Sequence, residues 1–191
     1  MKLDFKDHTE LQGSLSKAFL ELPSLKHLIL TGTSVSGDLA LLAKSPELLK
    51  LELLDLEVTG DLKELEKATK MQILDLGGTK IYGNLNALAK TVELEYLDLS
   101  QTRVTGDLGA LQNAEKLYGL YLSDTKVEGD IKALQKVTKL EDLDLENTDV
   151  SGDMASLREA KALKHVDISG TQIAGARSSA RYLRDIQLDQ S

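Results

Sequence analysis

The chain has no cysteine, no tryptophan and only two prolines, and aromatic residues make up 4% of its 191 positions. Because cysteine is absent, disulfide frameworks, thiolate nucleophiles and cysteine-based zinc sites are excluded. The same absence is typical of a reducing compartment, so we expect a cytoplasmic location, or secretion if a signal peptide has been removed. No apolar run approaches the length of a membrane-spanning helix, and residues 1–7 lack the apolar region of a signal peptide.

Basic residues are in the minority. The 23 Lys and Arg residues are outnumbered by 31 Asp and Glu residues, which gives a net charge of −8 and a pI near 5.0. Nucleic-acid binders and proteins that bind anionic membranes need a basic surface, so we expect neither as a partner. The charge balance instead favours a partner that is basic or of mixed charge.

Seven glycines recur at a fixed interval of 23 residues, without a single insertion or deletion. They are Gly37, Gly60, Gly83, Gly106, Gly129, Gly152 and Gly175. A fixed period of this length predicts a solenoid, in which each repeat packs against its neighbours. Hydrophobic residues make up 41% of the chain, which is enough for the repeats to share a continuous core.

Each repeat opens with apolar residues in the pattern Leu-x-x-Leu-x-Leu, clearest at Leu94, Leu97 and Leu99. The last two alternate with a period of two, so we expect them to point inward from a short strand. Stacking the repeats places these strands side by side in a parallel sheet, with about 4.8 Å between neighbours.

A threonine column and a valine or isoleucine column follow, as at Thr102 and Val104. A polar residue that recurs between apolar columns is expected to be buried, and its hydroxyl then needs a hydrogen bond. We expect its partners to be backbone groups of adjacent coils.

After the glycine, Asp or Asn precedes an apolar pair with helical spacing, as in Asp107 before Leu108 and Leu111. This pattern predicts a helix N-cap rather than a ladder of metal ligands.

The repeat divides the chain into three parts. Residues 1–24 match it with one extra residue, which predicts a degenerate capping repeat that ends in one or two helical turns. Residues 25–175 contain seven repeats in register, the last one incomplete. Residues 176–191 leave the pattern, and their apolar residues suit an amphipathic helix, so we predict a C-terminal helical cap or tail.

The full phrase, Leu-x-x-Leu-x-Leu-x-x-Thr-x-Val-x-Gly-Asp-Leu-x-x-Leu, resembles the leucine-rich repeat over residues 25–175. Its Val-x-Gly-Asp-Leu segment is similar to the plant-type subclass. That subclass has Ile-Pro where this chain has Asp-Leu, Asn where it has Thr, and one residue more per repeat. The resemblance implies an α/β fold: a right-handed solenoid with a parallel β-sheet on its concave face and short helices or 3-10 turns on its convex face. It also implies a concave face that binds other macromolecules.

Residues beside the inward leucines are expected to point to this concave surface. The column between the two leucines is largely acidic, and tyrosines lie near the middle of the surface. Carboxylates stacked on neighbouring strands repel one another, and a basic partner would relieve that repulsion. Tyrosines are typical anchors of binding surfaces. We therefore predict a monomeric protein-binding or peptide-binding module whose contacts are Asp75, Tyr96, Asp98, Tyr121, Asp144 and Asp167. The alternative is that the acidic residues only keep an open sheet soluble.

Other functions have weaker support. Asp75 and Asp98 could resemble the paired carboxylates of a glycosidase, but an open sheet has no deep pocket to separate their pKa values. The chain has no phosphate-binding loop, His-Glu-x-x-His motif or nucleophile elbow, so we predict neither an enzyme nor a cofactor. A calcium or carbohydrate site is an alternative, with Asp142, Asp144, Glu146 and Asp167 as the oxygen ligands for calcium. Ice binding would need a uniform exposed threonine array, whereas the residues flanking the valine column are mixed and charged.

Overall fold

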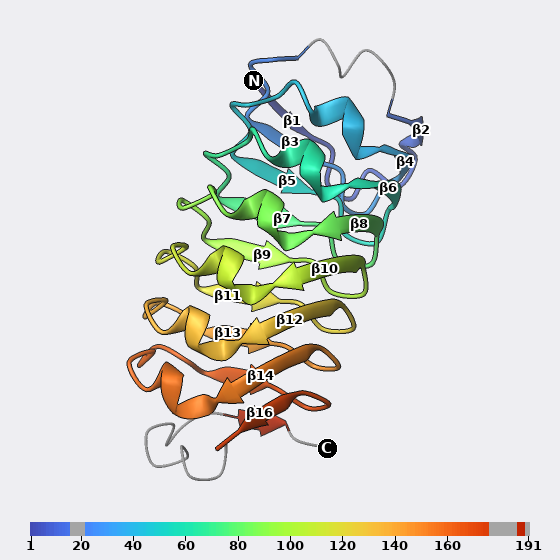
Figure 1. Cartoon of the computed structure of the whole chain (residues 1–191). Coiled ribbons are helices and arrows are strands. Elements are labelled where there is room, and N and C mark those ends of the chain that lie inside the picture. The colour runs from blue at the N-terminus through green and yellow to red at the C-terminus, as the bar shows by residue number, and fades with distance from the viewer. Residues whose placement is uncertain (16–21, 176–186, 190–191) are drawn as a thin grey trace.

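The chain winds through two parallel sheets, with one strand of each sheet in every regular coil (Figure 1). The computed structural model describes residues 1–15, 22–175 and 187–189. The nine-stranded sheet contains, in spatial order, β1 (Lys2–Asp4), β3 (His27–Ile29), β5 (Lys50–Glu52), β7 (Ile73–Asp75), β9 (Tyr96–Asp98), β11 (Gly119–Tyr121), β13 (Asp142–Asp144), β15 (His165–Asp167) and β17 (Gln187–Asp189). Because sequential coils are neighbours, the chain order of the repeats is also their order in space.

The second sheet has eight strands and runs alongside the first. Its strands are β2 (Gln12–Ser14), β4 (Ser34–Asp38), β6 (Glu57–Asp61), β8 (Lys80–Asn84), β10 (Arg103–Asp107), β12 (Lys126–Asp130), β14 (Asp149–Asp153) and β16 (Gln172–Ala174). These strands were not expected from the sequence pattern. The pattern Thr-x-Val-x-Gly alternates as a strand does, but a glycine near its end lowers strand propensity and indicates a turn instead.

Short 3-10 helices connect the second sheet back to the first. They are η2 (Leu39–Leu42), η3 (Leu62–Leu65), η4 (Leu85–Leu88), η5 (Leu108–Leu111), η6 (Ile131–Leu134) and η7 (Met154–Leu157). No α-helix occurs in the described residues, and no helix among them is long and apolar enough to span a membrane. The predicted solenoid with a parallel sheet and 3-10 turns is confirmed.

The core is one continuous cluster between the two sheets, made mainly of leucine columns. Leu94, Leu97 and Leu99 are fully buried, as are their counterparts in the neighbouring coils. Val104 faces them from the second sheet and is equally buried. The inward assignment of both apolar columns is therefore confirmed, and burial of this apolar area is the main stabilising contribution to the stack.

The threonine column is buried as predicted in four repeats, at Thr79, Thr102, Thr125 and Thr148, and only partly buried at Thr33 and Thr171 near the two ends. Its hydrogen-bond partners are not those expected. The hydroxyl of Thr102 donates to the carbonyl of Leu99 in its own coil at 2.6 Å, and Thr125 donates to Leu122 at the same distance. The expected bonds between coils are thus replaced by local bonds to the residue three positions earlier. A short hydroxyl reaches its own backbone at the turn, and this local bond competes with longer-range pairing.

The turns after the six strands β4, β6, β8, β10, β12 and β14 are each built by an Asp or Asn cap and a glycine. Asp107 accepts a hydrogen bond from the Gly109 N–H at 2.6 Å, and the equivalent N-cap bond occurs at Asp38, Asp61, Asn84, Asp130 and Asp153. The N-cap assignment is therefore confirmed. Gly129 has φ of 108°, and a Cβ there would lie 2.8 Å from the Asp107 carboxylate. Glycine is required at this position for both its backbone conformation and its lack of a side chain.

The two ends extend the sheets beyond the regular repeats. Strand β1 pairs with β3, so residues 1–4 cover the first strand of the repeat region. The helical turns expected before Pro23 fall mostly outside the described residues. The helix expected over 176–191 also lies outside them, except for β17, which is a strand and pairs with β15.

Candidate functional site

The outward side of the nine-stranded sheet carries the predicted contact residues. In each regular strand the middle residue is buried in the core, and the first and third residues point outward. We call this surface the open face. It is formed by the first-position residues His27, Lys50, Ile73, Tyr96, Gly119, Asp142 and His165 and the third-position residues Ile29, Glu52, Asp75, Asp98, Tyr121, Asp144 and Asp167. All six predicted contact residues belong to it, and each is partly exposed.

Strand register determines which of these residues are neighbours. Asp75 lies opposite Asp98, and Tyr121 lies opposite both Asp98 and Asp144. Asp144 in turn lies opposite Asp167. The structure therefore forms the two stacked carboxylate pairs expected from the sequence, separated by one tyrosine.

Hydrogen bonds from serine stabilise part of this acidic column. Asp98 Oδ1 accepts from the backbone N–H and the hydroxyl of Ser100, at 2.8 and 2.6 Å. Asp167 Oδ1 accepts the same pair from Ser169, at 2.9 and 2.7 Å. Sequence analysis missed these bonds, although an Asp-x-Ser spacing at the end of a strand is a known signal for such local turns.

Asp75 lacks this support because glycine replaces serine two positions later. Its Oδ1 is buried without a hydrogen-bond partner. Burial raises the pKa of Asp75 to about 6, the neighbouring Asp98 charge adds to the rise, and a hydrogen bond from the Gly77 backbone offsets part of it. A side chain at position 77 would displace Asp98, since a Cβ there would lie 2.8 Å from the Asp98 Oδ1. Asp75 is thus the least stabilised carboxylate of the column.

Three tyrosines form a cluster in the middle of the open face. The ring centroids of Tyr96 and Tyr121 are 5.4 Å apart, and those of Tyr96 and Tyr118 are 6.0 Å apart. Gly119 makes this possible, because a Cβ at that position would lie 2.9 Å from Tyr96 Cδ2 and 3.2 Å from Tyr121 Cε2. Both rings lean over the space that a side chain would fill. Sequence analysis named the tyrosines but not the glycine that brings them together.

The hydroxyls of Tyr96 and Tyr121 remain protonated in this environment. Burial and the nearby Asp98 and Asp75 charges raise the pKa of Tyr96. Burial raises the pKa of Tyr121 to about 12, with added effects from Asp142 and Asp98. The cluster therefore presents neutral phenol rings surrounded by carboxylates, an arrangement that attracts cations.

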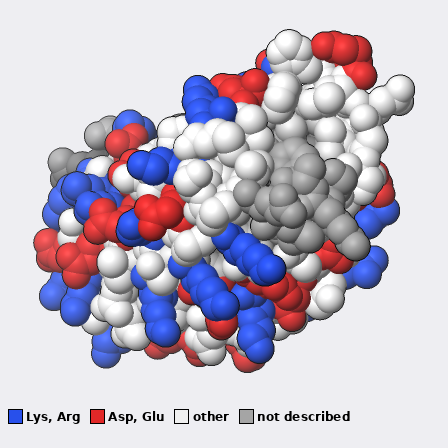
Figure 2. Space-filling view, turned by 90° about the horizontal axis from the view of Figure 1, so that it is seen from above, with Lys and Arg blue, Asp and Glu red and all other residues white. Residues whose placement is uncertain are grey.

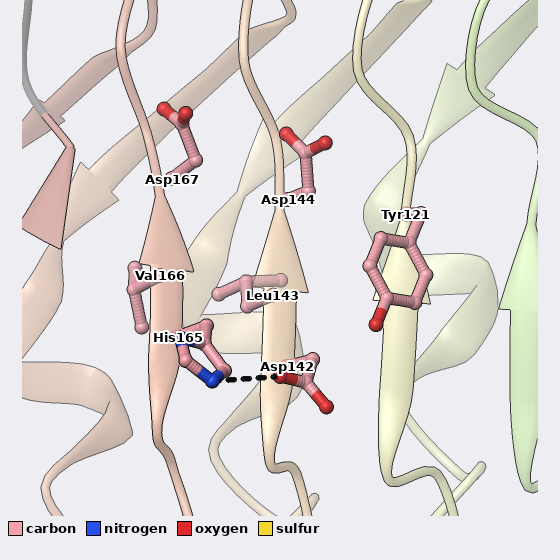
Figure 3. A pocket seen from close by; sticks show the side chains of 7 residues that line it. All are labelled: Tyr121, Asp142, Leu143, Asp144, His165, Val166 and Asp167. Carbon is pink, nitrogen blue, oxygen red and sulfur yellow. Dashed lines mark ion pairs between the residues drawn. The ribbon is translucent and has the colours of Figure 1, made fainter. Parts of the chain in front are cut away.

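A shallow hollow adjoins the tyrosine cluster on its C-terminal side (Figure 3). Its volume is about 370 Å³, and it is lined by Tyr121, Asp142, Leu143, Asp144, His165, Val166 and Asp167. Figure 3 shows the Asp144 and Asp167 carboxylates side by side where their strands end, with the Tyr121 ring at one edge. His165 Nε2 lies 4.0 Å from an Asp142 oxygen.

The oxygens of Asp144, Glu146 and Asp167 lie within 4.8 Å of one another, which includes three of the four residues considered for calcium. Calcium takes about six to eight oxygen ligands, more than these three side chains supply singly. The Asp144 oxygens already accept from Ser123 Oγ at 2.8 Å and from the Glu146 N–H at 3.0 Å. The cluster alone does not establish a metal site.

Charge divides the open face into two segments. At the N-terminal end, Lys50 pairs with Glu52 at 2.7 Å, and burial together with Lys2 and Lys50 lowers the pKa of His27. From β7 to β15 the outward residues include five aspartates, one histidine and no lysine or arginine. We call this second part the acidic segment. The acidic surface expected from the sequence is thus confined to the five strands from β7 to β15.

Solved structures with a similar fold come from plants and from a bacterium. The plant peptide hormone receptor RGFR1, in complex with RGF2, matches 97% of this chain with a TM-score of 0.81 and 23% identity. The Arabidopsis receptor kinase HAESA, in complex with the peptide hormone IDA and the co-receptor SERK1, matches 94% with a TM-score of 0.77 and 22% identity. This chain spans 31% of each of these two receptor chains.

Internalin C2 from Listeria monocytogenes matches the whole chain and 80% of its own length, with a TM-score of 0.72 and 19% identity. No family model and no curated protein matches the sequence. At these identities the likeness concerns the fold. The repeat and the fold together make this chain a leucine-rich-repeat solenoid.

Proposed function

We propose that the chain is a non-catalytic module that binds a basic protein or peptide through the acidic segment. The observation that supports this most is a cluster of three tyrosines among carboxylates that have no Lys or Arg partner in the part of the chain that the structure describes. Among the described residues, no Lys or Arg forms an ion pair with Asp75, Asp98, Asp144 or Asp167. A basic partner would supply the missing charges.

Elsewhere on the solenoid, acidic side chains do form ion pairs with lysines. Lysines and glutamates 23 residues apart meet across neighbouring coils, as in Glu47 with Lys70 at 2.8 Å and Glu93 with Lys116. Viewed from the N-terminal end, acidic and basic side chains are interspersed over the surface (Figure 2). The excess of negative charge on the acidic segment therefore differs from the mixed charge of the surrounding surface.

The tyrosines supply the apolar part of a binding surface. Tyr118 is 39% exposed, and Tyr96 and Tyr121 are partly exposed beside it. Aromatic anchors at the centre of an interface, surrounded by polar groups, contribute most of the binding energy in many complexes. The fold is consistent with peptide binding. RGFR1 and HAESA share the fold, and their structures were solved in complex with peptide hormones.

A catalytic role has less support from the geometry. Asp75 and Asp98 are adjacent on an open sheet, and the hollow beside Tyr121 is shallow. Enzyme sites usually enclose their substrate in order to exclude water and to shift pKa values strongly.

We further propose that the module acts as a monomer in the cytoplasm.

The proposal can be tested by selecting binders from a random displayed 12-residue peptide library on the wild-type protein. The selected peptides are then measured against Asp98→Lys/Asp144→Lys and against Glu128→Lys/Asp149→Lys. The second variant makes the same charge change on two exposed residues of neighbouring coils in the eight-stranded sheet. Circular dichroism melting verifies that both variants are folded.

We expect peptides rich in Lys and Arg that lose at least about tenfold in affinity with the first variant and change by less than about twofold with the second. Their affinity should also fall as salt is raised from 50 to 300 mM, in line with screening at those concentrations. Selected peptides that bind both variants equally would place the binding surface elsewhere and contradict the proposal.

A further inference from the structure

We propose that the tyrosine cluster, with the carboxylates of Asp98 and Asp142, forms a subsite for the guanidinium group of one arginine side chain of the partner. This inference rests on the proposed function and specifies its chemistry. The subsite comprises Tyr96 and Asp98 on β9, Gly119 and Tyr121 on β11, Tyr118 just before β11, and Asp142 on β13.

The strand register places carboxylates beside the tyrosine rings, where a cation bound over the rings would contact them. Asp98 lies beside Tyr121, and Asp142 lies beside Gly119, over which the rings of Tyr96 and Tyr121 lean. The rings are tilted by 43° to each other, so they do not stack face to face. A planar cation above one ring can therefore contact the second ring and still reach a carboxylate.

Several groups of the subsite have no hydrogen-bond or ion-pair partner among the described residues. Asp98 uses only Oδ1 in its bonds with Ser100. In the described part of the chain, the hydroxyls of Tyr96, Tyr118 and Tyr121 form no hydrogen bond with another residue. Burial is the main cause of the raised pKa values of Tyr96 and Tyr121, and the neighbouring carboxylate charges, which a bound cation would neutralise, raise them further.

Arginine suits this arrangement better than lysine. Its guanidinium is planar, stacks on aromatic rings and donates through several N–H groups to a carboxylate. It is also more weakly hydrated than an ammonium, so less hydration is lost when it lies against the phenol rings of Tyr96 and Tyr121. A lysine would satisfy the charge of Asp98 but would make fewer contacts with the rings.

The test uses three peptides, acetyl-Gly-Gly-X-Gly-Gly-amide, in which X is arginine, lysine or citrulline. Citrulline has the shape of arginine without its charge. Binding is followed by NMR on protein labelled with carbon-13 in its tyrosine rings. Tyr82 serves as an internal control, because it lies on the eight-stranded sheet and is 48% exposed.

We expect the signals of Tyr96, Tyr118 and Tyr121 to shift with the arginine peptide, while Tyr82 is unchanged. Millimolar affinity is expected for a single side chain, with arginine about five- to tenfold tighter than citrulline and about two- to fourfold tighter than lysine. Tyr96→Leu and Tyr121→Leu should each remove the preference for arginine over lysine, whereas Tyr82→Leu should leave it intact. Asp98→Asn retains an oxygen for Ser100 and should weaken the arginine peptide without affecting folding.

Equal affinities for arginine and citrulline would overturn the subsite, and equal affinities for arginine and lysine would overturn its selectivity for guanidinium. Shifts of Tyr82 as large as those of Tyr96 would indicate binding without a defined site and would also overturn it. These results differ from failure of the proposed function. Library peptides could still lose affinity with Asp98→Lys/Asp144→Lys without any requirement for arginine, in which case only the subsite fails.

Discussion

The two outward surfaces of this solenoid are built on the same alternation but carry different charges. On the eight-stranded sheet, Lys80 pairs with Glu57 of the preceding coil, and the Thr105 hydroxyl donates to the Gly83 carbonyl at 3.3 Å. On the acidic segment of the open face, Asp75 and Asp98 lie opposite each other, and neither forms an ion pair with a Lys or Arg of the described chain. A surface of mixed charge is thus sufficient to keep a solvent-exposed sheet of this solenoid soluble. Solubility therefore does not account for the excess of negative charge on the acidic segment.

The same contrast separates structural glycines from the glycine of the tyrosine cluster. Gly129 is the second-to-last residue of β12 and has φ of 108° with no room for a Cβ, whereas Gly119 has an ordinary φ and only movable ring atoms beside it. One glycine is required by the backbone and the other by neighbouring side chains. Their substitution should therefore affect different properties.

The largest expected effect is that of Gly129→Ala on stability. The new Cβ would meet the Asp107 carboxylate at 2.8 Å and hold the backbone in a strained region, so the free energy of unfolding should fall by roughly 2–4 kcal/mol. Gly119→Ala should lower it by less than about 1 kcal/mol, because the Tyr96 and Tyr121 rings can move. Urea unfolding measures both. Equal losses would contradict the distinction between the two glycines.

Gly119→Ala should instead alter binding. A methyl group 2.9 Å from Tyr96 Cδ2 forces the rings apart, so we expect about a threefold or greater loss of affinity for the arginine peptide. Gly109→Ala is a suitable comparison, since Gly109 belongs to η5 away from the open face. An unchanged affinity in Gly119→Ala would show that the position of the rings does not matter for binding.

Asp75 is the second point at which the open face differs from the rest of the surface. Its pKa is about 6 when folded and 3.8 ordinarily, so folding favours the protonated form. Stability contributed by the neutral carboxyl is therefore present below pH 3.8, decreases between pH 3.8 and 6, and is lost above pH 6. The groups that oppose its ionisation are Asp98, Glu52 and Asp55.

Asp75→Asn should accordingly stabilise the protein at pH 8 by roughly 1–2 kcal/mol, a value reduced for the partial exposure of the side chain. The gain should diminish as pH falls from 6 to 4. Asp149→Asn on the eight-stranded sheet is the control and should change stability by less than about 0.5 kcal/mol. A gain that is the same at pH 4 and pH 8 would show that Asp75 titrates normally.

Much of this architecture could be predicted from the sequence because it depends on periodicity. The columns of Leu97 and Leu99, the burial of Thr102 and the N-cap at Asp107 all follow from residue type and spacing within one repeat. The second sheet was missed because its regular strands have a glycine as their second-to-last residue, which indicated a turn. Each of these residue types recurs in at least six of the seven repeats, with Asn in place of Asp in one cap, so the copies reinforce the pattern.

The candidate site depends instead on where the repeats differ. The acidic and aromatic residues were identified as a surface, but the contact between Tyr96 and Tyr121 depends on a missing side chain at position 119. Likewise the difference between Asp75 and Asp98 depends on glycine or serine two residues later. Such effects arise from neighbours in three dimensions, and a pattern along the chain does not reveal them.

The smallest expected effect concerns the turn at the C-terminal end of β9. Gln101 has φ of 54°, a left-handed conformation that costs an ordinary residue about 1–2 kcal/mol, and the preceding coil has glycine at the equivalent position. Gln101→Gly removes this cost but increases the entropy of the unfolded chain, so we expect a net stabilisation of about 0.5 kcal/mol in urea unfolding. Because Gln101 is not part of the open face, affinity for the arginine peptide should be unchanged. A change in affinity would mean that the turn positions the tyrosines, and the subsite would then extend beyond the sheet.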